Sequence, residues 1–325
     1  MRRRAAYFLL LSAFFAAPPL RAQAPELSTF SIVACDTVAG FFGVAVQSRV
    51  VGAGSIVPAA RAGVGAIATQ AAANVGFKER ALAMLAEGRS AEEVRDALIA
   101  SDSGIENRQF AVIDSKCRIA AHTGSRTIAW AGHRIGKHYS VQGNILAGPE
   151  VVDAMAEAYE KAEAEGLPFG ERLLAALKAG QQAGGDTRGR QGAGLLIVKE
   201  GGGYGGGDDR YADLRVEDHV EPIFELERVY NVWMSVFHPE DHFVPNGRTP
   251  IAAPSGPHVC ALRTLLARAG YGSAPENPRA PCAFDDEVIA ALKAFQRAHG
   301  LEVRAAVTPE TAAKLREAAA SVRSR

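Results

Sequence analysis

A threonine close to a processed N-terminus is the residue whose position most directly suggests chemistry. Thr29 starts a β-rich apolar segment, Thr29 to Cys35, just after a stretch with the features of a secretory signal. An N-terminal threonine has an α-amine with a pKa of about 7.7 to 8, which can accept the proton of its own hydroxyl. Thr29 could then act as a nucleophile without a histidine. The alternative is a threonine that favours the start of a strand.

Acyl transfer from an amide also needs hydrogen-bond donors where negative charge develops on the carbonyl oxygen. Asn144 is the first candidate, because Gly143 precedes it and permits close approach to the backbone. Gln70 and Asn74 are the second candidates, as donors or substrate-binding residues. The alternative for each amide is a loop residue that caps a turn.

A polar glycine-rich segment, GGDTRGRQ, supplies Asp186, Arg188, Arg190 and Gln191. Two arginines in such a loop suit a substrate that carries a carboxylate or phosphate. Asp186 could pair with an arginine or hold the α-amine. The alternative is a solvated turn with internal salt bridges. The segment lacks the Gly-Lys-Ser/Thr ending of a phosphate-binding loop.

The histidines form no recognisable metal or triad pattern. His238 and His242 are four residues apart, but Pro239 lies between them and no third ligand is evident, which favours a surface loop. The G-x-S-x-G pattern of serine hydrolases is absent. We therefore expect no metal and no cofactor.

Composition narrows the function classes. The 325 residues contain 36 Lys plus Arg and 36 Asp plus Glu, so the net charge is zero. This balance gives no electrostatic reason to expect nucleic-acid binding. Hydrophobic residues make up 48% of the chain, enough for a sizeable core, and the length favours about two domains.

Residues 1–24 have the three parts of a signal peptide. Arg2 to Arg4 form the positive end, Ala5 to Ala17 the apolar run, and Ala24 ends a small-residue cleavage site. A membrane anchor is the alternative, but the apolar run is too short to span a bilayer. No membrane span is expected in the mature protein, which we predict to be periplasmic or secreted.

An exported protein can form disulfides. Cys260 and Cys282 lie close together in a small C-terminal segment, and we predict a disulfide between them. It would close a loop of about 20 residues and contribute about 3 kcal/mol. Cys35 and Cys117 each lie in an apolar, strand-like context. For this pair the sequence is compatible with two buried free thiols and also with a disulfide.

Apolar periodicity predicts separate runs of strands and helices. Residues 29–35 and 41–48 should form a hairpin, with Thr29 and Ser31 on one face of the first strand and Phe30 and Ile32 on the other. The segments GAGSIVPAA and GVGAIATQ are expected to be short strands, and residues 130–143 a surface loop. Helices are expected over 76–87, 91–100, 149–166, 168–180 and 222–233. Segregated runs favour an antiparallel, layered α+β fold.

The C-terminal part forms a separate small domain in this interpretation. Residues 246–257, NGRTPIAAPSGP, are rich in Pro, Gly and Ser and read as a linker. Three amphipathic helices follow. The expected organisation is a signal peptide (1–24), a main domain (28–243), a linker (244–257) and a three-helix domain (258–325).

Several motifs, in order, resemble a known family. STFSIVACD, GFFGVAVQS, GAGSIVPAARAGVGAIATQ, RQFAVID, WAGH, QGNILAG, AGQQAGGDTRGRQ and DLRVEDH are similar to the domain-of-unknown-function family 1028, placed in the N-terminal-nucleophile (Ntn) hydrolase superfamily. The resemblance covers about residues 29–233. It implies a four-layer αββα sandwich, amide-bond hydrolysis, a nucleophile at Thr29 and a role for Asn144.

The sequence departs from this family at its start. In many members the threonine directly follows the initiator Met, whereas cleavage after Ala24 leaves Pro25 to Ser28 ahead of Thr29. The Ntn mechanism therefore requires a second cut, by the same hydroxyl or by another protease. Ser28 is a weaker candidate nucleophile, because the resemblance places that role on the threonine.

The C-terminal segment resembles a peptidoglycan-binding domain of bacterial wall enzymes, through ALKAFQRAHGL followed by TPETAAKL. Many members read Asp-Gly before the last helix, where this chain has Arg304-Ala305-Ala306. The alternative is a plain helical docking domain. The resemblance implies peptidoglycan as a partner.

Together these features predict an exported amidohydrolase that acts on a small amide or a peptide, with Arg188 and Arg190 as substrate anchors. The alternative is an Ntn-fold scaffold without catalysis that binds the cell wall. Homo-oligomer formation stays open at this stage.

Overall fold

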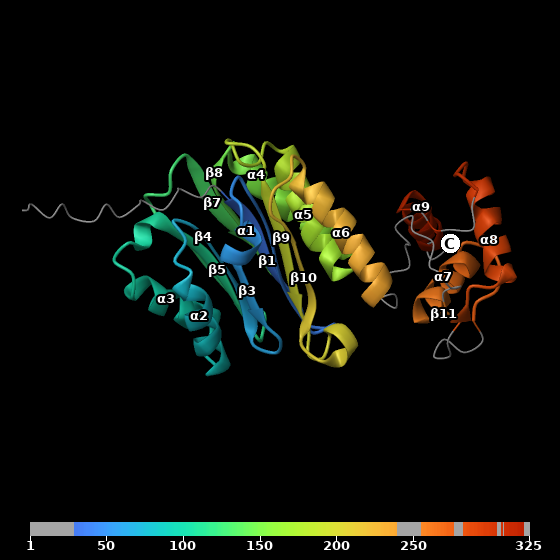
Figure 1. The fold of residues 1–325 in the computed structure, drawn as a ribbon, viewed down its shortest axis with the longest axis horizontal. Helices are drawn as coiled ribbons and strands as arrows, with labels where there is room; N and C mark the ends of the chain where they lie inside the picture. Colours follow the sequence, from blue (N-terminus) through green and yellow to red (C-terminus); the bar gives the residue numbers. More distant parts are fainter. Residues whose placement is uncertain (1–28, 239–254, 276–281, 304–306, 308, 322–325) are drawn as a thin grey trace, which may run out of the picture.

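The computed structural model describes residues 29–238, 255–275, 282–303, 307 and 309–321. Within residues 29–238, two antiparallel sheets face each other and helices cover the outer face of each (Figure 1). The strand order is β10-β9-β2-β1-β8-β7 in the larger sheet and β3-β4-β5-β6 in the smaller one. The predicted layered α+β fold is confirmed.

The larger sheet is built from β1 (Thr29–Asp36), β2 (Phe41–Ser48), β7 (Trp130–Ile135), β8 (Tyr139–Leu146), β9 (Gly192–Val198) and β10 (Arg210–Val216). The smaller sheet is built from β3 (Pro58–Arg61), β4 (Gly65–Ala71), β5 (Arg108–Asp114) and β6 (Ile119–Thr123). The helices of this part are α1 (Ala53–Ile56), α2 (Gly76–Ala86), α3 (Ala91–Ala100), α4 (Pro149–Ala164), α5 (Phe169–Gln182) and α6 (Pro222–Phe237).

Strand β1 lies inside the larger sheet and is covered on both faces. Phe30 and Ile32 belong to the core beneath α4 and α5, together with Leu173. Val33 belongs to the core between the two sheets. This alternation follows directly from the period of two along a strand, and it directs Thr29 and Ser31 toward the smaller sheet.

The second helical layer covers the smaller sheet. Phe77 of α2 and Val94 of α3 pack with Phe110 of β5 in one buried cluster. Helix α3 starts with the predicted capping box: Ser90 Oγ accepts from the Glu93 backbone N–H, and Glu93 Oε2 accepts from the Ser90 backbone N–H. Such a box satisfies two backbone donors that the first turn leaves open.

Two local predictions are wrong. The segment expected to be a surface loop, residues 130–143, contains β7 and most of β8. Its glycines belong to a bulged hairpin, with a register shift between Trp130 and Gly132, because bulges tolerate and often use glycine. The first half of GAGSIVPAA forms α1 instead of a strand. A Cβ at Gly54 would meet Gly194 Cα at 3.1 Å, so this turn depends on close glycine contact with β9.

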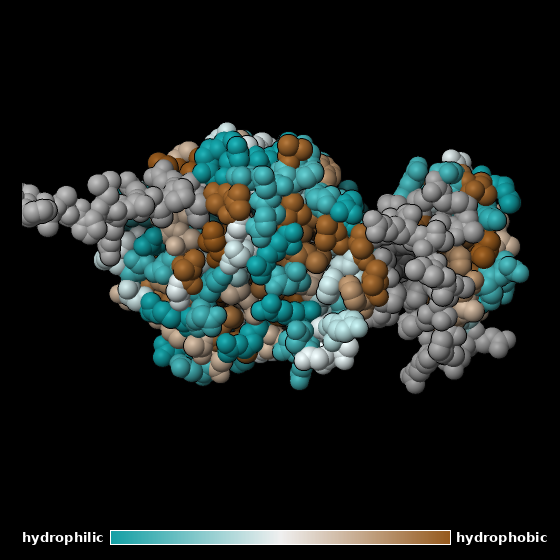
Figure 2. All heavy atoms as spheres, in the orientation of Figure 1, coloured by the Kyte–Doolittle hydropathy of each residue, from teal (hydrophilic) through white to brown (hydrophobic). Residues whose placement is uncertain are grey.

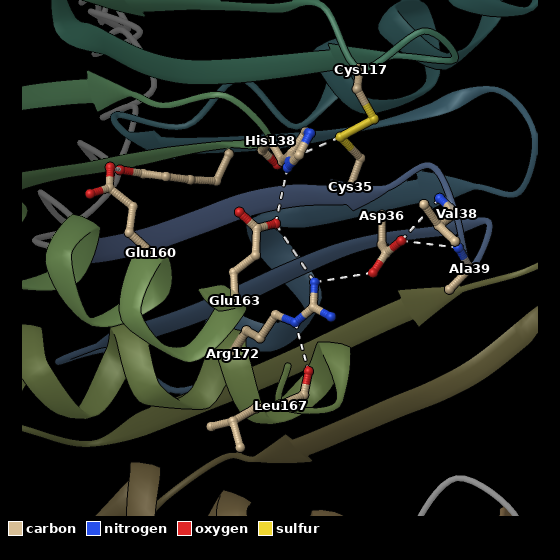
Figure 3. Close-up of polar contacts among 11 residues, drawn as sticks. Cys35, Asp36, Val38, Ala39, Cys117, His138, Glu160, Glu163, Leu167 and Arg172 are labelled. Atoms are coloured by element: carbon tan, nitrogen blue, oxygen red, sulfur yellow. Dashed lines mark hydrogen bonds and ion pairs between the residues drawn. A yellow bond between two sulfur atoms is a disulfide. The ribbon is translucent and has the colours of Figure 1, made fainter. Parts of the chain in front are cut away.

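A disulfide and a group of ion pairs hold the end of β1 that lies far from Thr29 (Figure 3). Cys35 is bonded to Cys117, in the turn between β5 and β6, so the bridge alternative for this pair is the correct one. Beside it, Arg172 Nη1 lies 3.1 Å from Asp36 Oδ2 and 3.6 Å from Glu163 Oε1. The disulfide joins the two sheets, and the ion pairs join β1 to the α4–α5 layer.

The C-terminal segment forms a small helical domain. Helices α7 (Pro257–Arg268), α8 (Asp286–Ala298) and α9 (Pro309–Ser321) accompany a short pair of strands, β11 (Ser255–Gly256) and β12 (Cys282–Ala283). Leu292, Phe295 and Leu315 form its centre with no solvent exposure. The predicted disulfide between Cys260 and Cys282 is present.

The remaining predictions on chain organisation fall outside the described residues. These are the signal peptide, Ser28, most of the linker, His242 and residues 304–306. Figure 2 shows a mixed surface in which apolar residues gather along α6, where Phe224, Val236 and Phe237 are exposed. Among the helices of the described residues, none is long and apolar enough to cross a membrane.

Candidate active site

Thr29 begins β1 and lies between the ends of two neighbouring strands. It pairs with Ser48 at the end of β2 and with Asn144 near the end of β8. Its side chain faces the smaller sheet and is 1% exposed. Its hydroxyl donates to Ser48 Oγ at 3.1 Å. Within the described part of the chain, no histidine or carboxylate side chain hydrogen-bonds to this hydroxyl.

Two amides contact the carbonyl oxygen of Thr29. Gln70 Nε2, from the smaller sheet, lies 3.3 Å from it, and Asn144 Nδ2 lies 3.5 Å from it. Both side chains are buried. The structure thus brings three predicted site residues, Thr29, Gln70 and Asn144, to one place between the sheets.

Further buried polar groups surround these three residues. Gln109 Oε1 accepts from Gln70 Nε2 at 2.8 Å and from Asn144 Nδ2 at 3.0 Å. Ser31 Oγ donates to Gln70 Oε1 at 2.6 Å and accepts from Gln142 Nε2 at 2.7 Å. Buried amides that satisfy each other in this way have fixed orientations, because each lost hydrogen bond costs about 1–3 kcal/mol.

Backbone strain flanks the same place. Ala71 follows Gln70 with φ 64°, and Ile145 follows Asn144 with φ 53°. A left-handed conformation is costly for a β-branched residue such as isoleucine. Such conformations cluster at functional sites, and here both lie directly after an amide that contacts Thr29.

The glycine-rich loop forms hydrogen bonds at the ends of β2 and β8, the two strands that flank Thr29. Asp186 pairs with Leu146 of β8 as an isolated bridge, and its Oδ2 accepts from the Arg49 backbone N–H at 3.1 Å, just beyond β2. Arg188 Nη2 lies 3.1 Å from Asp186 Oδ2, so the predicted pairing with an arginine is present. Asp186 is 3% exposed. Its buried carboxylate therefore organises the loop.

The other members of the predicted loop lie in a different environment. Arg190 forms an ion pair with Glu221, at the start of α6. Gln191 Oε1 accepts from Arg49 Nη1 at 2.9 Å. Arg49 is an exposed residue one position beyond Ser48, and none of the described carboxylates forms an ion pair with it. Sequence reasoning did not single out Arg49.

Asn74 lies apart from the amides around Thr29. Its Nδ2 donates to Asp102 Oδ2 at 2.8 Å, and Arg108 Nε lies 3.0 Å from the same oxygen. Burial opposes ionisation of Asp102, but the hydrogen bonds from Asn74, Gly104 and Arg108 outweigh it and lower the pKa of the carboxyl group. Within the described residues, Asn74 makes no hydrogen bond to Thr29.

A chain of hydrogen bonds leads from the buried amides to a histidine. Gln109 Nε2 lies 3.0 Å from Thr123 Oγ1, which lies 2.9 Å from His133 Nδ1. Burial lowers the pKa of His133, and the nearby His122 lowers it further. His133 is therefore held as a neutral ring over a wider pH range than a free histidine.

The site brings together a hydroxyl group and amide donors, and among the described residues no acidic or histidine side chain hydrogen-bonds to this hydroxyl. In the described ranges, no group of three or more His, Cys, Asp or Glu residues could hold a metal ion. Sequence reasoning missed Ser48, Gln109 and Gln142. A sequence signal for such residues does exist: each is a polar residue within a largely apolar strand. Gln109 in the segment RQFAVID is an example.

Comparisons with known proteins agree with this organisation. The model of the "Family of unknown function (DUF1028)" matches residues 29–226, and that of the "Putative peptidoglycan binding domain" matches residues 255–315. The chain is also similar to the crystal structure of protein SPO2555 from Silicibacter pomeroyi, which the DUF1028 model describes too. The identity is 30%, the TM-score 0.57, and the match covers 64% of this chain and 89% of that one. A comparison with curated proteins found no match. Because the first family model matches more than half of the chain, the chain belongs to family DUF1028.

Proposed function

We propose that the protein is an exported N-terminal-nucleophile amidohydrolase with Thr29 as nucleophile. One observation carries this proposal: the buried Thr29 hydroxyl is hydrogen-bonded to Ser48, and none of the described acidic or histidine side chains hydrogen-bonds to it. A free α-amine on Thr29 would supply the missing base within the same residue. Its ordinary pKa of about 7.7–8 lies close to neutral pH, as general-base catalysis requires.

The reaction follows from these groups. The amine takes the Thr29 hydroxyl proton while Oγ1 attacks the amide carbonyl of the substrate. The tetrahedral intermediate collapses to an ester on Oγ1, and the leaving amine receives the proton. Water, deprotonated by the same α-amine, then cleaves the ester and restores the hydroxyl. We propose Asn144, with Gln70 beside it, as the donors nearest to the developing oxyanion.

Two further observations support the proposal. The family match begins at Thr29 itself. The arrangement of two facing sheets between helical layers is the one that the resemblance to Ntn hydrolases implies. A fold can host several functions, so the site carries more weight than the architecture.

The mechanism requires cleavage of the Ser28–Thr29 bond. We propose that signal peptidase cuts after Ala24 and that a second cut follows before Thr29. The Thr29 hydroxyl could make this cut itself: Oγ1 attacks the Ser28 carbonyl, the peptide bond becomes an ester, and water releases the ester. Cleavage by another protease would give the same product.

The second domain suggests where the enzyme acts. The peptidoglycan-binding family match, together with two disulfides, indicates a location outside the cytoplasm and a role at the cell wall. We propose a small amide or a wall peptide as substrate, with Arg188 and Arg190 as candidate anchors. Both are weaker anchors than the sequence suggested, because Asp186 neutralises Arg188 and Glu221 neutralises Arg190.

The same family match favours a second candidate function, a wall-binding protein without catalysis. A β-lactone probe separates the two candidates, since the ring is opened by an active hydroxyl and leaves an ester adduct. The amidohydrolase should carry one adduct on Thr29, found by mass spectrometry of its peptides, and Thr29→Ala should carry none. Thr69→Ala is the matched control, because Thr69 is also buried in a strand but its hydroxyl has no hydrogen-bond partner in the described residues. Labelling that persists in Thr29→Ala would refute the nucleophile.

A further inference from the structure

Gln109 is the centre of the buried amide network, although among the described residues it makes no hydrogen bond to Thr29 itself. It lies on β5 of the smaller sheet and has no solvent exposure. Its Oε1 accepts from both amides that contact the Thr29 carbonyl, those of Gln70 and Asn144. Its Nε2 lies 2.8 Å from Gly143 O, 3.0 Å from Gly132 O and 3.0 Å from Thr123 Oγ1.

The orientation of Gln109 is determined by the backbone of the opposite sheet. Gly132 and Gly143 pair across the β7–β8 hairpin, next to its bulge, and their carbonyl groups can only accept hydrogen bonds. The Gln109 side chain must therefore present its NH₂ group to them and its oxygen to Gln70 and Asn144. That oxygen in turn requires both neighbouring amides to present N–H groups, which then face Thr29.

Two backbone carbonyls of the bulged β7–β8 hairpin converge on this one side chain of β5. A Cβ at Gly143 would lie 2.3 Å from Leu146 Cδ1, so a larger residue at this position would have to displace the Leu146 side chain.

We propose that Gln109 is a positioning residue, which turns the N–H groups of Gln70 and Asn144 toward Thr29 and holds them there during acyl transfer. This inference rests on the proposed function. Preorganised donors stabilise a developing oxyanion because they need no reorientation during the reaction. Without Gln109 both amides lose the hydrogen bond to its oxygen that helps to fix their orientation, and a displacement of about 1 Å can lower a rate by about 100-fold.

The test compares two buried glutamines, one in each of the two facing sheets. Gln109→Met removes the amide and keeps the volume. Gln47→Met is the matched control, because Gln47 is also fully buried, pairs with Phe30 on the helix-covered face, and has no hydrogen-bond partner for its amide in the described residues. The readout is the rate at which a β-lactone probe acylates Thr29. We expect about a 10- to 100-fold lower rate for Gln109→Met and an unchanged rate for Gln47→Met.

A second variant distinguishes positioning from a purely structural role. Gln109→Glu keeps the shape, and its protonated form offers a carbonyl acceptor to both amides and an O–H donor to Gly143. Its ionised form has no donor for the two glycine carbonyls. The rate of Gln109→Glu relative to the native protein should therefore rise as the pH falls from about 8 to about 5, since burial raises the pKa of a carboxyl group and its protonated fraction grows as the pH falls.

The possible outcomes separate the positioning role of Gln109 from the proposed function. Native labelling in both Gln109 variants overturns the positioning role while the proposed function stands. A relative rate of Gln109→Glu that does not change with pH also overturns it. If the native protein itself is not labelled at Thr29, the proposed function fails and the inference fails with it. If Gln109→Met does not fold, the pH profile of Gln109→Glu decides alone.

Discussion

Ser48 is the one described residue that holds the hydroxyl of Thr29. A serine hydroxyl is too weak a base to deprotonate a threonine, so its role is to orient Oγ1. Ser48→Ala should lower the rate of acylation at Thr29 by about tenfold and change the free energy of unfolding by only about 1 kcal/mol. Probe kinetics and urea denaturation measure the two effects. A full loss of labelling without unfolding would instead make Ser48 part of the chemistry.

His133 gives the protein a pH-dependent stability. Burial lowers the pKa of its ring in the folded state, so folding favours the neutral form. The stabilisation is present above the unfolded pKa of about 6.5 and is lost as the pH falls below it. The melting temperature of His133→Gln should therefore depend less on pH between about 7 and about 5 than that of the native protein. Identical pH profiles would contradict this assignment.

Arg172 is the residue that tests how much a partly buried group of ion pairs contributes to the free energy of unfolding. It is the cation between Asp36 and Glu163, and its side chain is 14% exposed. Arg172→Met removes the ion-pair partner of Asp36 and one of the partners of Glu163, which keeps its contact with His138. It should destabilise the protein by about 2 kcal/mol. Arg228→Met removes only a surface pair with Glu225 and should cost much less, because solvent screens that pair. Equal losses in thermal denaturation would contradict the role of burial.

At the scale of elements, the two sheets are held together differently at their two ends. Near Thr29 the contact is a network of amides, and at the far end it is the Cys35–Cys117 disulfide. This bridge closes a long loop, with a sequence separation of 82. Replacing both cysteines by alanine should lower the free energy of unfolding by about 2–5 kcal/mol.

The Cys260–Cys282 bridge provides the control for that prediction. It lies within the C-terminal domain, so its removal should destabilise residues 255–321 and leave the unfolding of residues 29–238 unchanged. Limited proteolysis followed by mass spectrometry reports on the two parts separately. A loss of protection in residues 29–238 after removal of Cys260–Cys282 would contradict this separation.

The sequence was sufficient for the elements with strong periodicity. Strand β1 and helices α3, α4 and α5 follow from apolar spacing and capping residues. The β7–β8 hairpin did not, because its strands are polar and rich in glycine, and a bulge interrupts their alternation. The short helix α1 depends on contact between Gly54 and Gly194, which are distant in sequence. Neither feature has a local signal.

The candidate site was predictable only in part, for a similar reason. Thr29 and Asn144 stood out through position, glycine context and family resemblance. Gln109 and Ser48 read as ordinary strand residues, and their importance follows from the pairing of strands and the facing of two sheets. Arg188 and Arg190 looked equivalent in the sequence, but Asp186 binds one and Glu221 the other.

At the scale of the whole molecule, two family matches describe two separate parts of the chain. Residues 29–226 carry the candidate site, and residues 255–315 match a peptidoglycan-binding family. If the second part directs the enzyme to the wall, the full chain should sediment with purified peptidoglycan, and Thr29→Ala should sediment equally well. Weaker sedimentation of Thr29→Ala would mean that the first domain also holds the wall polymer.

The mass of the exported protein tests the central claim most directly. The proposal requires a free amine on Thr29, and therefore a chain that begins at this residue. Intact mass and N-terminal sequencing of the protein recovered from the periplasm or medium should both give Thr29 as the first residue. A chain that begins at Pro25, with no further processing and with amidase activity intact, would contradict the mechanism.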